Sequence, residues 1–296
     1  MRWTLKPEPN PNITSNLAQE LGVDDTIAKL LVQRGIETFE QAKSFFRPSL
    51  ENLHNPYLMK DMDRAVERIE SAIKNGENIL VFGDYDVDGT TSVSLMASYL
   101  KEIHPNIATY IPDRYDEGYG VSYQGIDYAE DNNITLIIAL DCGIKAIDKV
   151  LYAKEKGIDF IICDHHRPGN EIPAAIAVLD PKREACEYPY KELCGCGVGF
   201  KLIQALAEKR GQTIEDLVEY LDLVSIAIAA DIVPITGENN PIYTIVDTGI
   251  YSVEVAYSAS CIASGELIVE YSQNPVVNNP TLISCDINQD GRAIYD

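Results

Sequence analysis

Five short, largely apolar runs alternate with helix-length stretches between residues 78 and 179, and this alternation constrains the fold more than any other feature of the chain. The runs are NILVFG (78–83), IATYI (107–111), ITLIIAL (134–140), DFIIC (159–163) and AIAVL (175–179). Because successive positions are apolar and the intervals can hold helices, the runs predict parallel strands that are covered on both faces. We therefore expect an α/β fold built on a doubly wound, mostly parallel sheet.

The remaining segments differ from this alternating part. Residues 1–77 are helix-prone, and the apolar side chains of residues 62–73 recur at the spacing of one helix face. The tail has one basic residue against seven acidic ones, and its residues 251–257 alternate at period two. We expect three parts: a helical segment that packs on the core (1–77), an α/β domain (78–240) and a β-type tail of unassigned role (241–296). Within the domain we expect helices at 90–103, 122–132, 145–156, 199–210 and 213–229, the last beginning with a Thr213-x-x-Asp216 capping box.

Composition restricts the partners and the compartment. The 24 Lys and Arg residues against 46 Asp and Glu residues give a net charge of −22, which argues against broad, sequence-blind phosphate binding. Any nucleic-acid site must therefore be local. No apolar run reaches the roughly 18 residues that cross a bilayer, and residues 1–12 contain no apolar stretch of a signal peptide. With seven cysteines and no C-x-x-C pair, we expect reduced thiols, a cytoplasmic protein and no membrane partner. The oligomeric state stays open.

Acidic side chains follow three of the predicted strands at the point where each strand ends. The strand at 78–83 is followed by D-Y-D-V-D-G, the strand at 134–140 by D-C-G and the strand at 159–163 by D-H-H. The carboxyl ends of parallel strands meet at one edge of a sheet, where open α/β sheets bind their ligands. An isolated carboxylate, Asp231, ends the apolar stretch IAIAAD. The residues concerned are Asp84, Asp86, Asp88, Asp141, Asp164, His165, His166 and Asp231.

Such a cluster predicts a cation site. Carboxylates gathered at a buried strand end persist only when they are protonated, hydrogen-bonded or bound to cations. Oxygen ligands with one imidazole suit Mn²⁺ or Mg²⁺. Taken alone, a D-x-D-x-D-G run is more often a turn or a Ca²⁺ loop, and a His-His pair is more often a surface or capping feature. Their occurrence on separate strands of one sheet favours the metal site.

Two further segments could bind phosphate. Gly195-Cys196-Gly197-Val198-Gly199 precedes a helical stretch that contains Lys201, and N–H groups at such a helix start can hold an anion, although tight helix packing explains the glycines equally well. The loop at 113–122 carries Arg114 with Tyr115 and Tyr119. This mixture suits phosphate pairing and base stacking, but a solvated loop with aromatic anchors has the same composition. We take Arg114, Gly197 and Lys201 as candidate substrate-binding residues.

Several motifs, in a fixed order, resemble the DHH phosphoesterase family and its RecJ-type branch of single-strand-specific exonucleases. The matching stretches cover about residues 1–240 and are VFGDYDVDGTTS, YIPDRYDEGYGVS, IALDCG, CDHHRPG, AVLDPKR, CGCGVGFKL and IAIAADIVP. The resemblance implies a site for two divalent cations, Mn²⁺ or Mg²⁺, whose ligands are Asp86, Asp88, Asp141, His165 and Asp231. It implies that Asp141 bridges the ions, that Asp84 acts near the first ion and that His166 contacts the scissile phosphate. Phe82 stands where many family members have a histidine, so the first ion's ligand shell departs from the family pattern.

The activity implied by this resemblance is metal-dependent hydrolysis of single-stranded DNA from its 5′ end, in DNA repair and recombination. Family members continue into a DHH-associated domain and an OB-like domain, whereas here an acidic β-type tail follows residue 240. We therefore expect impaired processive degradation. The run Asp286-x-Asn288-x-Asp290-Gly291 in the tail resembles the start of a Ca²⁺ loop but lacks the later Glu, and we interpret it as a turn. Two alternatives stay open: a phosphoesterase for pyrophosphate or short oligonucleotides, and a non-catalytic module.

Overall fold

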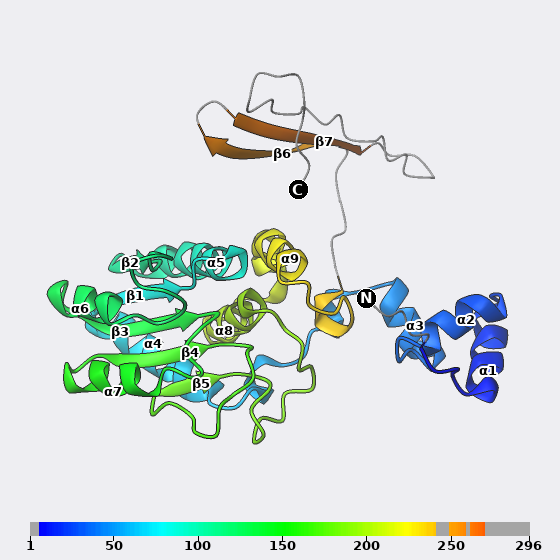
Figure 1. Ribbon diagram of the computed structural model, residues 1–296, viewed down its shortest axis with the longest axis horizontal. Helices are drawn as coiled ribbons and strands as arrows, with labels where there is room; N and C mark the ends of the chain where they lie inside the picture. The colour runs from blue at the N-terminus through cyan, green and yellow to red at the C-terminus, as the bar shows by residue number, and fades with distance from the viewer. Residues whose placement is uncertain (1–5, 241–248, 259–260, 270–296) are drawn as a thin grey trace. The chain divides into compact units, whose positions relative to one another are not determined.

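A computed structural model describes residues 6–240, 249–258 and 261–269 of the chain (Figure 1). It divides into two compact units, Met1–Ile242 and Tyr243–Asp296. The first unit carries the sheet that the sequence predicts. Among the described residues, no helix is both long enough and apolar enough to cross a bilayer.

The first unit is built on a sheet of five parallel strands in the order β2-β1-β3-β4-β5. The strands are β1 (Asn78–Gly83), β2 (Ile107–Tyr110), β3 (Ile134–Leu140), β4 (Asp159–Cys163) and β5 (Ala177–Leu179). From β1 the chain first moves outward to β2 and then crosses back to β3 on the other side of β1. The order therefore reverses between β1 and β3, and a crevice for ligands forms outside the carboxyl ends of strands at such a point.

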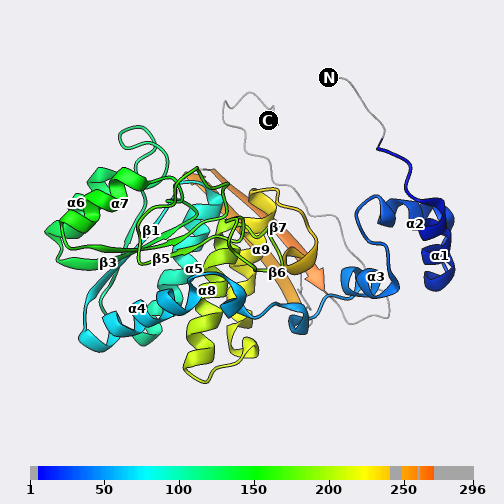
Figure 2. The same ribbon diagram turned by 90° about the horizontal axis from the view of Figure 1, so that it is seen from below.

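Helices cover both faces of this sheet, as the uninterrupted apolar strands require. One core packs the sheet against α4 (Met62–Asn75), α5 (Val87–Ile103), α8 (Gly195–Lys209) and α9 (Leu221–Ala230). The other core packs it against α6 (Tyr123–Asp131) and α7 (Ile147–Glu155). Figure 2 shows α6 and α7 on one side of the sheet and α4 and α8 on the other. Val81 belongs to the first core and its neighbour Leu80 to the second, because successive strand side chains point to opposite faces. The fold is α/β and doubly wound, as predicted.

The structure differs from the predicted helices at their starts. α5 begins at Val87 and α8 at Gly195, several residues before the predicted starts. In each case the preceding side chain caps the helix, since the Asp86 carboxylate accepts the N–H of Gly89 and the Cys194 sulfur accepts the N–H of Gly197. The prediction of one continuous helix at 213–229 is wrong. The capping box forms, but it opens a 3₁₀ helix, η3 (Ile214–Tyr220), and α9 follows.

The segment before the sheet is helical, with a small core of its own. It contains α1 (Pro11–Leu21), α2 (Asp25–Val32) and α3 (Phe39–Phe46), which bury Leu17, Ala28, Leu31, Ile36 and Ala42 together. The 3₁₀ turns η1 (Leu50–Asn52) and η2 (Pro56–Leu58) lead from α3 to α4. A last 3₁₀ turn, η4 (Gly237–Asn239), ends the described part of the first unit.

The tail contains a hairpin. Strands β6 (Gly249–Ser258) and β7 (Cys261–Val269) pair antiparallel. The period-two run at 251–257 lies in β6, in agreement with β-type structure. The D-x-N-x-D-G run at 286–291 lies outside the described residues.

Candidate metal centre

Acidic and imidazole side chains from four elements meet at the point where the strand order reverses. His165, which follows β4, lies at their centre. Its Nε2 atom is 3.2 Å from Oδ1 of Asp141, 3.6 Å from Oδ2 of Asp231 and 3.9 Å from Oδ2 of Asp88. Asp141 follows β3, Asp88 lies in the first turn of α5, and Asp231 ends α9. The structure therefore brings four of the predicted ligands together, with three carboxylates around one imidazole nitrogen.

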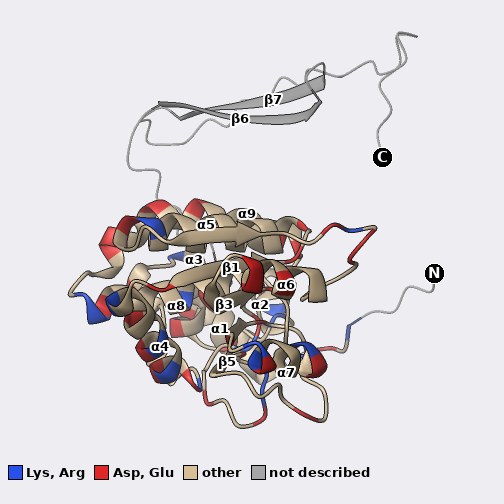
Figure 3. Ribbon diagram, turned by 90° about the vertical axis from the view of Figure 1, so that its left-hand side faces the viewer, with Lys and Arg blue, Asp and Glu red and all other residues tan. Residues whose placement is uncertain are grey.

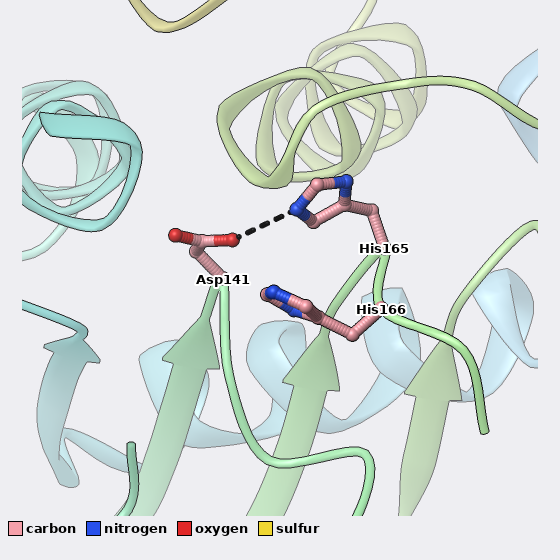
Figure 4. Close-up of side chains that lie close together, drawn as sticks. All are labelled: Asp141, His165 and His166. Carbon is pink, nitrogen blue, oxygen red and sulfur yellow. Dashed lines mark ion pairs between the residues drawn. The ribbon is translucent and has the colours of Figure 1, made fainter. Parts of the chain in front are cut away.

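The environment of His165 and Asp141 leaves polar atoms available for a cation. Both ring nitrogens of His165 and Oδ1 of Asp141 are buried and have no hydrogen-bond partner within the described part of the chain. His166 joins the same group, because one ligand atom of each residue lies within 4.8 Å of the others (Figure 4). Buried polar groups without partners are rare in native structures and call for a ligand or ion. The donor set, mainly carboxylate oxygen with imidazole nitrogen, fits divalent cations such as Mn²⁺ or Mg²⁺.

Asp141 is held in a position that few residues adopt. Its backbone has φ 57°, in the left-handed region, and its N–H donates to the Cys163 carbonyl at 2.8 Å. Burial raises the pKa of its carboxyl to about 10, and the nearby charges of Asp88 and Asp86 act in the same direction. In the metal-free protein the ionised form of this carboxyl is strongly disfavoured. A cation beside it would stabilise that ionised form.

The other two carboxylates of the D-x-D-x-D-G run have different surroundings. Asp84 is fully buried, and its Oδ1 accepts the N–H of Gly120 at 3.1 Å while Oδ2 has no partner among the described residues. Burial raises the pKa of Asp84, and the charge of Asp86 adds to this effect. Asp86 is exposed and caps α5 through Oδ1, which accepts the N–H of Gly89 at 2.9 Å. Asp86 lies close enough to affect the pKa of both Asp84 and Asp141, although it is not among the tightest ligand groups.

The glycine-rich start of α8 holds a carboxylate where we expected phosphate. The N–H groups of Gly195 and Cys196 donate to the two oxygens of Asp88 at 2.6 and 2.7 Å. The N–H of Gly197 donates to the Cys194 sulfur at 3.3 Å. Gly197 is buried and its N–H is occupied, so the structure does not present it to a substrate. The anion-binding chemistry of a helix start is present, but it serves a side chain of the protein itself.

Lys201 is also placed away from the substrate side. Its side chain is 2% exposed, and Nζ donates to the His54 carbonyl at 2.6 Å and lies 3.1 Å from Oε1 of Glu238. The Glu238 carboxylate also accepts the Tyr188 hydroxyl at 2.6 Å. Because all of these partners are internal, Lys201 serves as one half of a buried ion pair. The prediction that it binds substrate does not agree with this position.

His166 points to the accessible side of the centre and is oriented by Asp164. Oδ1 of Asp164 accepts the N–H of Nδ1 of His166 at 2.7 Å, and its Oδ2 accepts the backbone N–H of Ile144 at 2.9 Å. The hydrogen bond to Asp164 raises the pKa of His166 to about 9. Burial acts to raise the pKa of Asp164, but its bonds to His166 and Ile144 outweigh burial and lower it. Sequence reasoning noted Asp164 but gave it no role; its place one residue before the histidines was the available signal.

Exposed aromatic and basic side chains lead from the loop at 113–122 to His166. The Arg114 guanidinium lies 5.3 Å from the ring centre of Tyr85, and the Tyr85 ring contacts Tyr119 edge-on at 6.3 Å. The Tyr119 hydroxyl lies 3.1 Å from Nε2 of His166. Tyr115, in the same loop, is 91% exposed. Tyr85 is a residue that sequence reasoning missed, since nothing in the D-Y-D-V-D run marks its ring as a partner of Arg114. We call Arg114, Tyr85 and Tyr119 the aromatic track.

Comparison with known proteins identifies the family. Residues 78–228 match the model described as DHH family, N-terminal domain. The chain is 41% identical over 245 residues to the single-stranded-DNA-specific exonuclease RecJ of Bacillus subtilis, and 33% identical over 236 residues to that of Escherichia coli. These matches cover 83% and 76% of this chain. The structure of RecJ in complex with Mn²⁺ from Thermus thermophilus is similar with a TM-score of 0.65 and 26% identity, over 81% of this chain and 33% of that one.

The chain spans 30% and 40% of the length of the two relatives named first, so the similarity concerns one part of those proteins. Within that part the matched segment runs from β1 to α9 and contains all of the site residues described above except Asp231, which follows it by three positions. The matched region makes up about half of the chain. On this basis the chain belongs to the DHH family, whose N-terminal domain its residues 78–228 form.

Proposed function

We propose that the chain hydrolyses phosphodiester bonds with the help of two divalent cations, Mn²⁺ or alternatively Mg²⁺. One observation carries this proposal: an unpartnered, buried imidazole nitrogen of His165 faces carboxylates of Asp88, Asp141 and Asp231 that come from three different elements. The related RecJ structures bound to manganese and to magnesium support it. Bound ions in such a site supply an acidified water and neutralise charge on the phosphate.

Each residue of the centre would contribute in its own way. Asp141 belongs to one close group with His165 and His166, while Asp88 and Asp231 form a second group around the same His165 nitrogen. These groups share His165, and the resemblance to the DHH family is what assigns Asp141 to the position between the two ions. The same resemblance implies that Asp86 and Asp88 would hold one ion, with Asp84 close to it, and that Asp231 would complete the other, although Asp88 and Asp231 share one group in the metal-free chain.

His166 would contact the substrate, whereas the other residues of the centre would bind the metal ions. In the metal-free chain its bond to Asp164 raises the pKa of His166 to about 9, so this imidazole would bring a proton and a positive charge to the site. Its Nε2 atom faces the Tyr119 hydroxyl on the exposed side. A fixed cationic donor at this place stabilises the charge that develops on a phosphate during hydrolysis. His166 therefore orients the phosphate and does not serve as the nucleophile.

As substrate we propose single-stranded DNA, degraded from its 5′ end, with a role in DNA repair and recombination. The names of the relatives support the strand preference, and the aromatic track supports a polymer, because stacked aromatic rings and a guanidinium suit bases and phosphates. A pocket of about 190 Å³ beside His166 adds Lys145 and Lys149 to the positive side of the site. Figure 3 shows Lys and Arg mixed with Asp and Glu along α4 and α7, and Lys149 itself lies on α7 next to Asp148. The thiols of Cys142, Cys163, Cys186, Cys194 and Cys196 are free, which suits a cytoplasmic location.

A comparison of two substrates tests this function. The intact chain is incubated with Mn²⁺ and either a 5′-phosphorylated single strand of several tens of nucleotides or a dinucleotide, and Asp141→Ala serves as the inactive control. Release of mononucleotides from the long strand, absent in the control, supports the proposal. Turnover of the dinucleotide alone favours a small-substrate phosphoesterase, the second candidate, because the same two-metal chemistry serves both substrates. No turnover of either substrate, together with no Mn²⁺ binding, favours a non-catalytic module.

A further inference from the structure

Asp180 is a buried acid beside the centre that the proposed function does not use. It follows β5 and is fully buried. β5 pairs with β4, and the pairing continues past the strand ends, because the N–H of Asp164 donates to the carbonyl of Leu179 at 2.9 Å. Asp180 therefore lies at the end of the strand next to the one that carries His165.

Asp180 and His165 each present a buried polar atom without a partner. Oδ1 of Asp180 accepts the N–H of Lys182 at 2.7 Å, whereas its Oδ2 has no hydrogen-bond partner among the described residues. Nδ1 of His165 likewise has no hydrogen-bond partner among the described residues. Figure 4 shows this nitrogen on the side of the ring directed away from Asp141. Cys163 is in register with Leu179, and the hydrogen bond from Asp164 to Leu179 extends this pairing, so His165 and Asp180 follow neighbouring strands at the same edge of the sheet.

Arg183 holds the turn that contains Asp180 in place through two contacts. Nη1 of Arg183 pairs with Oδ2 of Asp61 at 2.7 Å and also donates to the carbonyl of Val178 in β5. Asp61 has φ 68°, a conformation that costs free energy in a residue other than glycine and persists where surrounding contacts enforce it. The carboxylate of Asp180 thus rests on a turn with little freedom to move away.

We infer that Asp180 is a positioning residue for His165: its free oxygen holds the proton of Nδ1 through one bridging water and so presents the unprotonated Nε2 to the cation. Histidines that bind metals generally donate their other ring N–H in this way, which fixes both the tautomer and the ring orientation. The inference rests on the proposed metal-dependent function, since presenting Nε2 matters only if an ion binds there. The carboxylates around Nε2 would otherwise draw the proton to that nitrogen.

The tautomer of His165 tests this without any metal. In the metal-free, ¹⁵N-labelled chain, the two-bond nitrogen–proton couplings of the ring report which nitrogen carries the proton. We expect the Nδ1–H form in the natural chain and in Asp180→Asn, whose amide oxygen still accepts, and a shift towards the Nε2–H form in Asp180→Leu. A natural chain with the Nε2–H form, or the same tautomer in all three proteins, overturns the inference.

A second test of the role of Asp180 is the affinity for Mn²⁺, measured by titration calorimetry. We expect Asp180→Leu to bind Mn²⁺ about 10 to 100-fold more weakly than the natural chain, and Asp180→Asn to stay within a few-fold. Asp148→Leu, which removes an exposed carboxylate of α7, is the control for the loss of one negative charge. Equal affinity in all variants overturns the positioning role while the metal proposal stands. If the natural chain binds no Mn²⁺, the proposed function fails, and the tautomer measurement still decides the relation between Asp180 and His165.

Discussion

Oδ2 of Asp88 lies 2.6 Å from the backbone nitrogen of Gly195, and this contact joins the first turn of α5 to the first residue of α8. A helix start carries partial positive charge and unpaired N–H groups, so it stabilises the ionised form of a carboxylate. Burial nevertheless raises the pKa of Asp88, which means that the helix start compensates only part of the lost hydration. A bound cation would remove the rest of the free-energy cost of ionising Asp88.

Gly195 also allows Asp141 to approach α8. A methyl group on Gly195 would lie 2.5 Å from Cβ and Oδ1 of Asp141. We expect Gly195→Ala to displace that carboxylate and to weaken Mn²⁺ binding at least about tenfold, as measured by calorimetry. Gly197→Ala is the matched control in the same helix turn, because its new methyl would meet nothing closer than 3.4 Å. Equal Mn²⁺ affinity in both variants would contradict the role given to this contact.

The buried pair of Lys201 and Glu238 is expected to contribute to stability. Lys201→Met leaves Glu238 buried without its cation, and removal of one partner of a buried pair costs about 3–5 kcal/mol of unfolding free energy. Urea unfolding measures this. Lys43→Met, in the exposed pair with Glu40, should change the free energy of unfolding by less than about 0.5 kcal/mol. If Lys201→Met unfolds normally and instead raises KM for DNA, Lys201 binds substrate after all.

His166 should titrate far above an ordinary histidine in the metal-free chain. NMR titration is expected to give a pKa of about 9, and Asp164→Asn should bring it back towards 6.5. Because the folded pKa is raised, the stabilisation from the protonated His166 is fully present below about pH 6.5 and is lost as the pH rises through about 9. The stability difference between the natural chain and His166→Gln should therefore shrink over that interval. A pKa near 6.5 in the natural chain would refute the assigned bond to Asp164.

The aromatic track should matter for long substrates. Arg114→Ala removes the guanidinium that lies over Tyr85, and the loss of one charged contact to phosphate should raise KM for a long single strand roughly tenfold. KM for a dinucleotide should change little if the track binds nucleotides away from the scissile bond. Arg47→Ala, an exposed arginine at the end of α3, controls for the loss of one positive charge. A similar rise of KM for both substrates would place Arg114 at the scissile phosphate.

The sequence was sufficient to predict the sheet and most of the centre. The apolar runs mark β1, β3 and β4 at their observed bounds, because strands buried on both faces are apolar at nearly every position. Asp141 and His165 follow directly from those bounds, since the carboxyl ends of parallel strands meet. Its position at the end of an apolar stretch made Asp231 a candidate, but only the family motif gave it a role, because no periodicity places a residue at the end of α9 beside His165.

The substrate contacts were harder to predict, because they depend on which partner a polar group meets in the folded chain. Nothing in the glycine cluster says that Asp88, 107 residues earlier, occupies the helix start. Lys201 looked available to phosphate, yet its partner Glu238 lies 37 residues further along the chain. Tyr85 is likewise plain in the sequence, but its importance depends on Arg114, whose guanidinium lies over its ring only in the folded chain.

The most direct test of the account is the anomalous diffraction of a crystal of the chain grown with Mn²⁺ and measured at the manganese edge. We predict two anomalous peaks at the carboxyl ends of β1, β3 and β4, with His165 on one ion and Asp141 in contact with both. Asp88 and Asp231 should have moved towards the ions from their present positions around Nε2. A well-ordered structure with Mn²⁺ in the medium and no peak within reach of Asp141 and His165 would contradict the metal-dependent hydrolysis proposed for this chain.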